Sequence, residues 1–308
     1  MAFTAKDVAT LREKTGCGMM DCKKALTEAD GDFDKAVDIL REKGLAASQK
    51  KAGRIAAEGI VFAKVDDKKK TGIVVEVNAE TDFVAKNAEF LAFVEAVADT
   101  IIENSPADVD ALNALKAAGS EMTVEELTRE KILTIGENIK IRRFVKYDGA
   151  VVSYVHMGGK IGVLVKFKTL AKIAKTAEFK SFGKDIAMQI AAISPQYITA
   201  DEVPADVVEK EKSILAEQLR NDDKNKNKPA NIIDKIVAGR IGKFFEEVCL
   251  VDQSYVKDQD IKVSKYVEDT AKALGGDIQI EAFTRFEKGE GLEKREDNFA
   301  EEVASMMK

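Results

Sequence analysis

An internal duplication in the middle of the chain constrains the fold more than any other feature. The run Glu58-Gly-Ile-Val-Phe-Ala-Lys-Val is followed, after a short polar turn, by Thr71-Gly-Ile-Val-Val-Glu-Val. Both runs have a counterpart 90 residues later, as Asp148-Gly-Ala-Val-Val-Ser-Tyr-Val and Ile161-Gly-Val-Leu-Val-Lys-Phe. A self-similarity at one fixed offset indicates that a single scaffold has been used twice.

Each copy continues into an amphipathic helix. Residues 88–106 match residues 177–195 at an offset of 89, and apolar side chains recur at helical spacing at Phe90, Phe93 and Val97. The two β-rich runs before each helix flank a polar turn, as the strands of a hairpin do. The sequence therefore predicts an α+β fold whose core is a duplicated unit of hairpin and helix.

The residues before the duplication predict a separate helical unit. Thr4 and Asp32 are placed to cap the first and third of three short helices, and Gly44 is expected to end the third. The run Ser48-Gln-Lys-Lys-Ala-Gly-Arg then reads as a linker. Between the two copies, Thr123-Val-Glu-Glu is a capping box that predicts a further helix.

After the second copy, apolar stripes predict an antiparallel helical hairpin with arms of roughly 25 to 30 Å. Its polar loop is Asn221-Asp-Asp-Lys-Asn-Lys-Asn-Lys-Pro, and the pattern leaves open whether the hairpin projects or packs down on the core. Residues 278–286 alternate like a strand, and residues 298–308 predict a terminal helix. The expected units are residues 1–53 (helical), 54–140 (first core subdomain), 141–202 with 249–285 (second core subdomain), 203–248 (hairpin) and 286–308 (C-terminal module).

Composition disfavours several classes of function. The 54 acidic and 48 basic residues give a net charge of −6, which disfavours general nucleic-acid binding. No apolar run reaches the ~18 residues of a membrane span, and the start of the chain does not resemble a secretory signal. Cys17, Cys22 and Cys249 lack the pattern of a disulfide framework, so all three are expected to be reduced in an intracellular, cytoplasmic protein.

No catalytic or metal constellation stands out. His156 is the one histidine, which excludes a histidine-centred metal cluster, and its position favours a surface loop over a partner contact and either over catalysis. Gly16-Cys-Gly lacks the third glycine of a dinucleotide loop and follows a helix. We therefore expect no metal, no cofactor and no bond-breaking chemistry. A carboxylate pair assembled by folding stays open as the one enzymatic alternative.

Two short segments are candidates for contact with a partner. Met19 and Met20 lie at a glycine-bounded turn, although burial is the more common fate of such side chains. Thr81-Asp-Phe-Val lies where a strand ends and a helix approaches. The second copy has Ala171-Lys-Ile in place of Thr81-Asp-Phe, so the scaffold does not require that triplet. Composition alone favours a core role for Phe83, but this divergence within a kept duplication favours a functional one.

Four runs carry a resemblance to a known family. They are Thr15-Gly-Cys-Gly-Met-Met-Asp-Cys-Lys-Lys-Ala-Leu, Thr81-Asp-Phe-Val-Ala-Lys-Asn, Gly136-Glu-Asn-Ile-Lys-Ile-Arg-Arg and Arg285-Phe-Glu-Lys-Gly-Glu-Gly-Leu-Glu-Lys. In this order the chain resembles the bacterial translation elongation factor Ts family over essentially its whole length. The lysine-rich hairpin loop and a long stretch between Asp252 and Asp277 depart from the family's pattern.

The resemblance implies a guanine-nucleotide exchange factor for the GTPase elongation factor Tu, acting in translation elongation, alone or in a homodimer or 2:2 complex. It implies an N-terminal ubiquitin-associated-like domain, a duplicated α+β core, an inserted coiled-coil hairpin and a C-terminal helical module. The residues it places against the partner are Arg12, Met19 and Met20 (G domain), Thr81, Asp82, Phe83 and Val84 (magnesium and phosphate region) and His156 (third domain).

Two other functions remain as alternatives. The N-terminal three-helix unit alone is compatible with a ubiquitin-binding adaptor, which binding of residues 1–53 to ubiquitin would support. A hydrolase that uses the carboxylates would show turnover abolished by a single carboxylate change.

Overall fold

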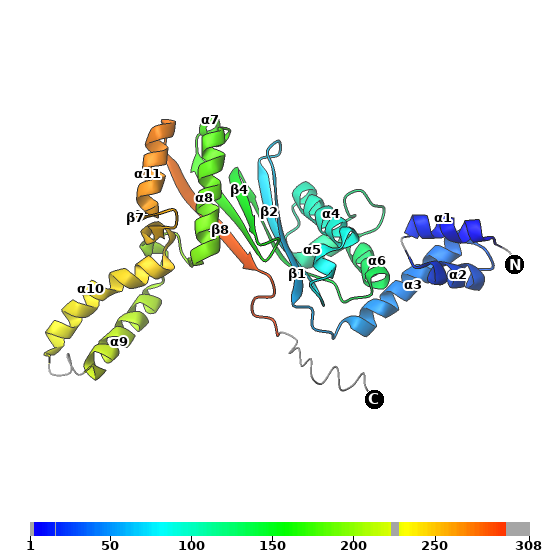
Figure 1. Cartoon of the computed structure of the whole chain (residues 1–308), viewed down its shortest axis with the longest axis horizontal. Coiled ribbons are helices and arrows are strands. Elements are labelled where there is room, and N and C mark those ends of the chain that lie inside the picture. The colour runs from blue at the N-terminus through cyan, green and yellow to red at the C-terminus, as the bar shows by residue number, and fades with distance from the viewer. Residues whose placement is uncertain (1–2, 16, 223–227, 294–308) are drawn as a thin grey trace.

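The computed structural model describes residues 3–15, 17–222 and 228–293. It mixes helices with small antiparallel sheets, which confirms the α+β class (Figure 1). The expected helix at residues 298–308 lies outside the described residues. No described helix is long and apolar enough to cross a membrane.

The N-terminal helices are α1 (Ala5–Thr15), α2 (Met19–Glu28) and α3 (Phe33–Lys51). Asp32 caps α3 as predicted, because its side chain accepts hydrogen bonds from the backbone N–H groups of Asp34 and Lys35. The prediction that Gly44 ends this helix was wrong, because α3 continues to Lys51 through most of the expected linker. Gly44 is instead buried where α3 crosses α6 (Val124–Ile135): a Cβ there would lie 3.5 Å from the Arg129 carbonyl oxygen. That distance is an ordinary van der Waals contact, so Gly44 lies within the packing of α3 against α6 and does not mark a helix end.

The first copy of the core is an antiparallel sheet in the order β1 (Glu58–Asp66), β2 (Thr71–Ala79), β3 (Lys140–Asp148). Helices α4 (Ala88–Asn104) and α6 pack with it around one apolar cluster. The connecting elements are η1 (Val84–Lys86) and α5 (Val109–Ala114).

The second copy repeats this plan in the order β4 (Ala150–His156), β5 (Ile161–Thr169), β8 (Ile278–Glu287), with α7 (Ala171–Ala174) and α8 (Ala177–Ile193). Ser105 and Ser194 end α4 and α8 in the same left-handed conformation. β8 runs to Glu287 and so crosses the boundary expected at residue 285.

The two sheets pack against each other through duplicated positions. Val61 and Val74 of the first copy meet their counterparts Val151 and Leu164 in one buried cluster. The duplicated glycines make this approach possible. A Cβ on Gly72 would lie 2.8 Å from Val151 Cγ1, and one on Gly162 would lie 2.4 Å from Val61 Cγ1. The glycine that the sequence repeats therefore marks the sheet-to-sheet contact.

Both sheets also carry a β-bulge at the same place. Between Glu76 and Val77 the pairing skips Arg142 of β3, and between Lys166 and Phe167 it skips Glu281 of β8. A bulge sets two residues of one strand against one residue of its partner. In the first copy it faces two arginines towards one carboxylate.

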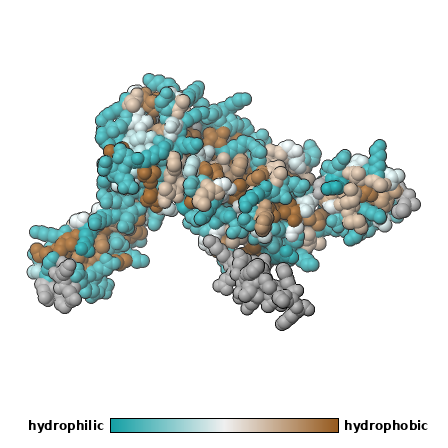
Figure 2. All heavy atoms as spheres, viewed as in Figure 1, coloured by the Kyte–Doolittle hydropathy of each residue, from teal (hydrophilic) through white to brown (hydrophobic). Residues whose placement is uncertain are grey.

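The hairpin projects from the second copy, away from the N-terminal helices (Figure 1). Its arms are α9 (Ala205–Asn221) and α10 (Ala230–Val248), which follow η2 (Ala200–Glu202). Leu219, Ile233 and Val237 form a core belonging to the hairpin alone, and Figure 2 shows apolar residues along it among hydrophilic ones. The chain returns to the core through η3 (Leu250–Asp252), β6 (Ser254–Tyr255), β7 (Asp258–Lys262) and α11 (Val263–Leu274).

Candidate interaction surface

The loop that follows β2 displays a large apolar side chain to solvent. Phe83 is 79% exposed, whereas the next residue, Val84, is 7% exposed and belongs to the apolar cluster of the first copy. The hypothesis that Phe83 is a core residue, which composition favours, is therefore wrong. An exposed phenylalanine on an anchored loop is the kind of surface feature that marks an interaction site.

Hydrogen bonds hold this loop on its N-terminal side. The Glu137 carboxylate accepts from the Thr81 backbone N–H at 3.0 Å and from the Thr81 hydroxyl at 2.7 Å. The neighbouring Glu80 carboxylate accepts from the Asn138 backbone N–H at 2.6 Å. Both anchors come from the segment before β3. The run that begins at Gly136 thus fixes the conformation of the loop.

The loop is also fixed on its C-terminal side. Asn87 caps α4, with its side-chain oxygen accepting from Glu89 N–H at 2.7 Å. Asp82 keeps an exposed carboxylate whose Oδ2 lies 3.4 Å from Lys86 Nζ. Because this pair is solvent-exposed, it holds the carboxylate only weakly. Phe83 and Asp82 therefore stand side by side on a loop that is ordered before any partner arrives.

The second copy shows what the scaffold does without this specialisation. The helix caps Asn87 and Thr176 and the pattern of buried residues match the two loops at an offset of 89, which pairs the buried Ile173 with Val84. The expected match of Ala171-Lys-Ile to Thr81-Asp-Phe is therefore one residue out, and Lys172 takes the place of Phe83. That position is exposed in both copies, but only the first copy has a large apolar side chain there. This contrast separates the Phe83 loop from the structural needs of the fold.

The other predicted contact residues are also exposed. Met19 and Met20, at the start of α2, are 45% and 61% exposed, so the expectation of burial was wrong. Arg12 is exposed on α1. Gly18 precedes α2 without a side-chain cap, and the buried Cys22 and Leu26 fill the inner face of the helix. The two methionines begin that helix on its outer side.

His156 ends β4 and is exposed, which agrees with a surface position although it belongs to the strand and not to a loop. Its Nδ1 lies 2.9 Å from the Tyr154 hydroxyl, and Met157 beside it is also exposed. The predicted residues thus form three patches on separate elements. In the described part of the chain, no hydrogen bond or ion pair joins one patch to another.

Comparison with known proteins agrees with these motifs. A family model described as Elongation factor TS matches residues 80–290, from the residue before Thr81 into the turn after β8. The chain belongs to the elongation factor Ts family.

Curated elongation factor Ts proteins match along the full length. That of Syntrophotalea carbinolica is 51% identical over 311 residues, covering 100% of both chains. That of Trichlorobacter lovleyi is 49% identical and covers 99% of this chain and 98% of the relative. That of Clostridioides difficile is 48% identical and covers 99% of each. The chain is therefore a translation elongation factor.

Sequence reasoning missed the buried carboxylate that joins two of the four motifs of this chain. Glu76 of β2 is fully buried, and its oxygens lie 3.0 Å from Arg142 Nη1 and 2.6 Å from Arg143 Nε. The Gly289 backbone N–H donates to the same carboxylate at 2.8 Å, and Arg142 Nη2 donates to the Glu290 carbonyl at 2.6 Å. The hub made of Glu76, Arg142, Arg143 and Gly289 ties the turn after β8 to the first sheet.

Only glycine fits at position 289. Its φ is +68°, and a Cβ would lie 2.2 Å from the Ala57 carbonyl oxygen. The glycine of the fourth motif is thus required by the hub. A signal was present in the sequence, since two adjacent arginines follow an apolar strand position, but only the bulge explains why both reach one carboxylate.

Cys17, Cys22 and Cys249 are free and buried. Burial raises the pKa of the Cys17 thiol and raises that of Cys249 to about 11, so both remain protonated at neutral pH. Among the described residues, no group of histidine, cysteine and carboxylate side chains is arranged to hold a metal.

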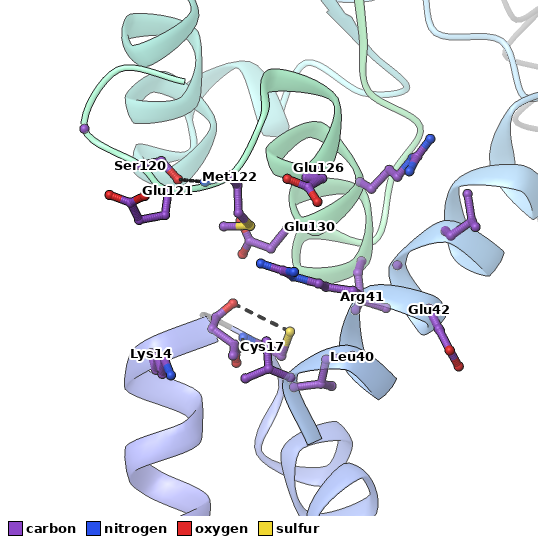
Figure 3. A pocket seen from close by; sticks show the side chains of 17 residues that line it. Lys14, Cys17, Leu40, Arg41, Glu42, Ser120, Glu121, Met122, Glu126 and Glu130 are labelled. Carbon is purple, nitrogen blue, oxygen red and sulfur yellow. Dashed lines mark hydrogen bonds between the residues drawn. The ribbon is translucent and has the colours of Figure 1, made fainter. Parts of the chain in front are cut away.

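A cavity of about 540 Å³ separates the N-terminal helices from the core beside α6. Figure 3 shows Cys17 and Leu40 facing Met122 and Glu130 across it. Burial raises the pKa of Glu130, although Lys131 Nζ lies 3.1 Å from its carboxylate. The N-terminal unit therefore meets the core through a partly hollow interface, chiefly between α3 and α6.

Proposed function

We propose that this protein is a guanine-nucleotide exchange factor that binds elongation factor Tu carrying GDP and promotes release of the GDP in the cytoplasm. It acts by binding and carries out no bond-breaking chemistry. The observation that supports this proposal best is Phe83, which is exposed on a loop locked by Glu137 and by the buried Val84. An ordered apolar side chain can enter a partner without the cost of ordering the loop during binding.

The proposed mechanism places Phe83 and Asp82 at the magnesium and phosphate region of the GTPase. Phe83 displaces elements that hold the phosphates. The Asp82 carboxylate brings negative charge towards those phosphates or competes for the coordination shell of the metal. Because its salt bridge to Lys86 is exposed and weak, Asp82 gives up little when it moves to the partner.

The energetics require more than one contact. A GDP bound with nanomolar affinity is held by about 12 kcal/mol, so the exchange factor needs comparable differential affinity for the nucleotide-free partner. Contacts at Arg12, Met19 and Met20 with the G domain, and at His156 with the third domain, supply a broad interface. The ubiquitin-associated-like unit at residues 1–53 is proposed to carry the first of these patches.

The test is the release of a fluorescent GDP from purified elongation factor Tu, chased with unlabelled GDP, with and without this chain. The release rate is expected to rise with the concentration of the chain and then to saturate. A rate that stays at its intrinsic value at every concentration would refute the proposed function.

A first prediction concerns the methionine patch. Replacing Met19 and Met20 together with alanine is expected to raise the Kd for elongation factor Tu roughly tenfold, about 1.4 kcal/mol, because two exposed apolar contacts are lost. The melting temperature should stay unchanged. Ile193→Ala, at a similarly exposed side chain of the second copy, is the matched control. An equal Kd for the methionine variant and the control would remove this patch from the interface.

A second prediction concerns self-association, which we propose to run through the hairpin in a homodimer or 2:2 complex. Removing residues 205–247 and closing the gap with a short linker keeps the Val248 carbonyl, which accepts hydrogen bonds from Gln196 and Tyr197. Because the hairpin core is its own, the variant should fold, sediment as a lighter species and largely retain exchange. Unchanged sedimentation together with lost exchange would reverse this assignment.

A further inference from the structure

The second copy contains an apolar pocket between its own helices and the turn of the first hairpin. The cavity measures about 430 Å³. Figure 1 shows α7 and the turn between β1 and β2 at the same end of the two sheets. The apolar residues that line the pocket include Ala150, Val151, Val152, Ala174 and Phe179.

The duplication explains why the pocket is open. Ala150 and Val152 stand 90 residues after Ile60 and Phe62. In the first copy Ile60 is buried in the apolar cluster, and Phe62 packs against it. Ile60 also packs against the turn between β4 and β5, because a Cβ on Gly159 in that turn would lie 2.1 Å from Ile60 Cγ1.

Two smaller side chains therefore leave space in the second copy where the first copy is filled. Protein interiors are close-packed, and an unfilled apolar cavity lowers stability. A pocket kept open by two replacements within one scaffold is best explained by an occupant.

The charged residues at the rim of the pocket indicate that the occupant is negatively charged. Lys70, Lys175 and Lys180 line it, and the one carboxylate among the described lining residues, that of Asp67, is paired with Lys180 at 2.6 Å. Lys70 and Lys175 are exposed and have no ion-pair partner in the part of the chain that the structure describes. This local excess of positive charge contrasts with the net charge of −6.

We propose that the pocket docks an apolar side chain from an acidic segment of a partner protein. The side chain fills the space beside Ala150 and Ala174, and flanking carboxylates pair with Lys70 and Lys175. Such pairing adds specificity and speeds association more than it adds affinity. This site goes beyond the proposed exchange activity, since the Phe83 loop belongs to the first copy.

The test measures the anisotropy of a fluorescently labelled synthetic peptide, Asp-Asp-Leu-Phe-Glu-Glu, titrated with the full chain. The variant carrying Ala150→Ile and Val152→Phe restores the side chains of the first copy and is expected to bind the peptide at least tenfold more weakly while melting no earlier. Lys175→Glu is expected to weaken binding several-fold. A peptide with Ser-Ser in place of Leu-Phe should not bind.

Three results would overturn the proposal. They are no binding of the acidic peptide by the wild-type chain, equal binding by the wild type and the filled variant, and binding of laurate without binding of the peptide, which would assign the pocket to a small amphipathic anion. If the filled variant does not fold, Lys175→Glu and the Ser-Ser peptide decide, because equal binding in both comparisons excludes the site.

Discussion

Replacing Phe83 with alanine is expected to slow the exchange-stimulated release of GDP from elongation factor Tu by tens to hundreds of fold. This range corresponds to a loss of about 2 to 3 kcal/mol from the complex with the nucleotide-free partner, as for an interface hot spot. The melting temperature should hardly change, since the side chain is 79% exposed and a surface substitution of this kind costs within ~0.5 kcal/mol. Stopped-flow release of fluorescent GDP and thermal unfolding measure the two quantities.

The duplication supplies a matched control. Ile173→Ala changes the buried counterpart of Val84 in the second copy and is expected to cost about 2 to 5 kcal/mol of stability through the cavity it leaves. Its exchange activity per folded molecule should be close to that of the wild type. A Phe83→Ala chain that keeps full exchange activity, with or without a lower melting temperature, would contradict the proposed role of Phe83.

The largest effect on stability is expected from Glu76→Ala. The change leaves Arg142 and Arg143 without their shared carboxylate and the Gly289 N–H without its acceptor. Breaking a buried ion pair by removing one partner costs about 3 to 5 kcal/mol. The melting temperature should fall by roughly 6 to 20 °C. Thermal unfolding followed by circular dichroism gives the value.

The equivalent bulge of the second copy provides the comparison. Lys166 and Glu281 pair there at 2.8 Å, but both side chains are partly exposed. Glu281→Ala is therefore expected to cost under about 1 kcal/mol, because solvent screens the pair. Equal losses for Glu76→Ala and Glu281→Ala would show that burial of the first carboxylate contributes nothing to the stability of the hub.

Much of the fold could be predicted from local pattern. The repeated glycines and apolar runs predict the strands β1, β2, β4 and β5, and the cap at Asp32 and the capping box at Thr123 mark helix starts that the structure contains. These features depend on residues close in sequence. The prediction that Gly44 ends α3 was wrong because the surroundings of that glycine depend on α6. The backbone of α6 lies beside Gly44 although it is about 85 residues away in the sequence.

The candidate surface could be predicted only in part. The divergence of the second copy from Thr81-Asp-Phe separated function from scaffold at Phe83, although the structure matches that triplet to Leu170-Ala-Lys and not to Ala171-Lys-Ile. Met19 and Met20 could not be assigned, because a helix start has no periodicity that tells an inner face from an outer one. The hub around Glu76 could not be foreseen, since the alternation of a regular strand places Arg142 and Arg143 on opposite faces and only the bulge brings both to one carboxylate.

The central claim is that the chain binds elongation factor Tu and that GDP weakens this binding. Titration calorimetry at a series of GDP concentrations with Mg²⁺ present tests this directly. Linkage is reciprocal, so a factor that weakens GDP binding must itself be bound more weakly when GDP is present. The account predicts that the affinity of the chain for elongation factor Tu falls steadily as GDP rises, and falls less for Phe83→Ala. An affinity that is the same at every GDP concentration would contradict it.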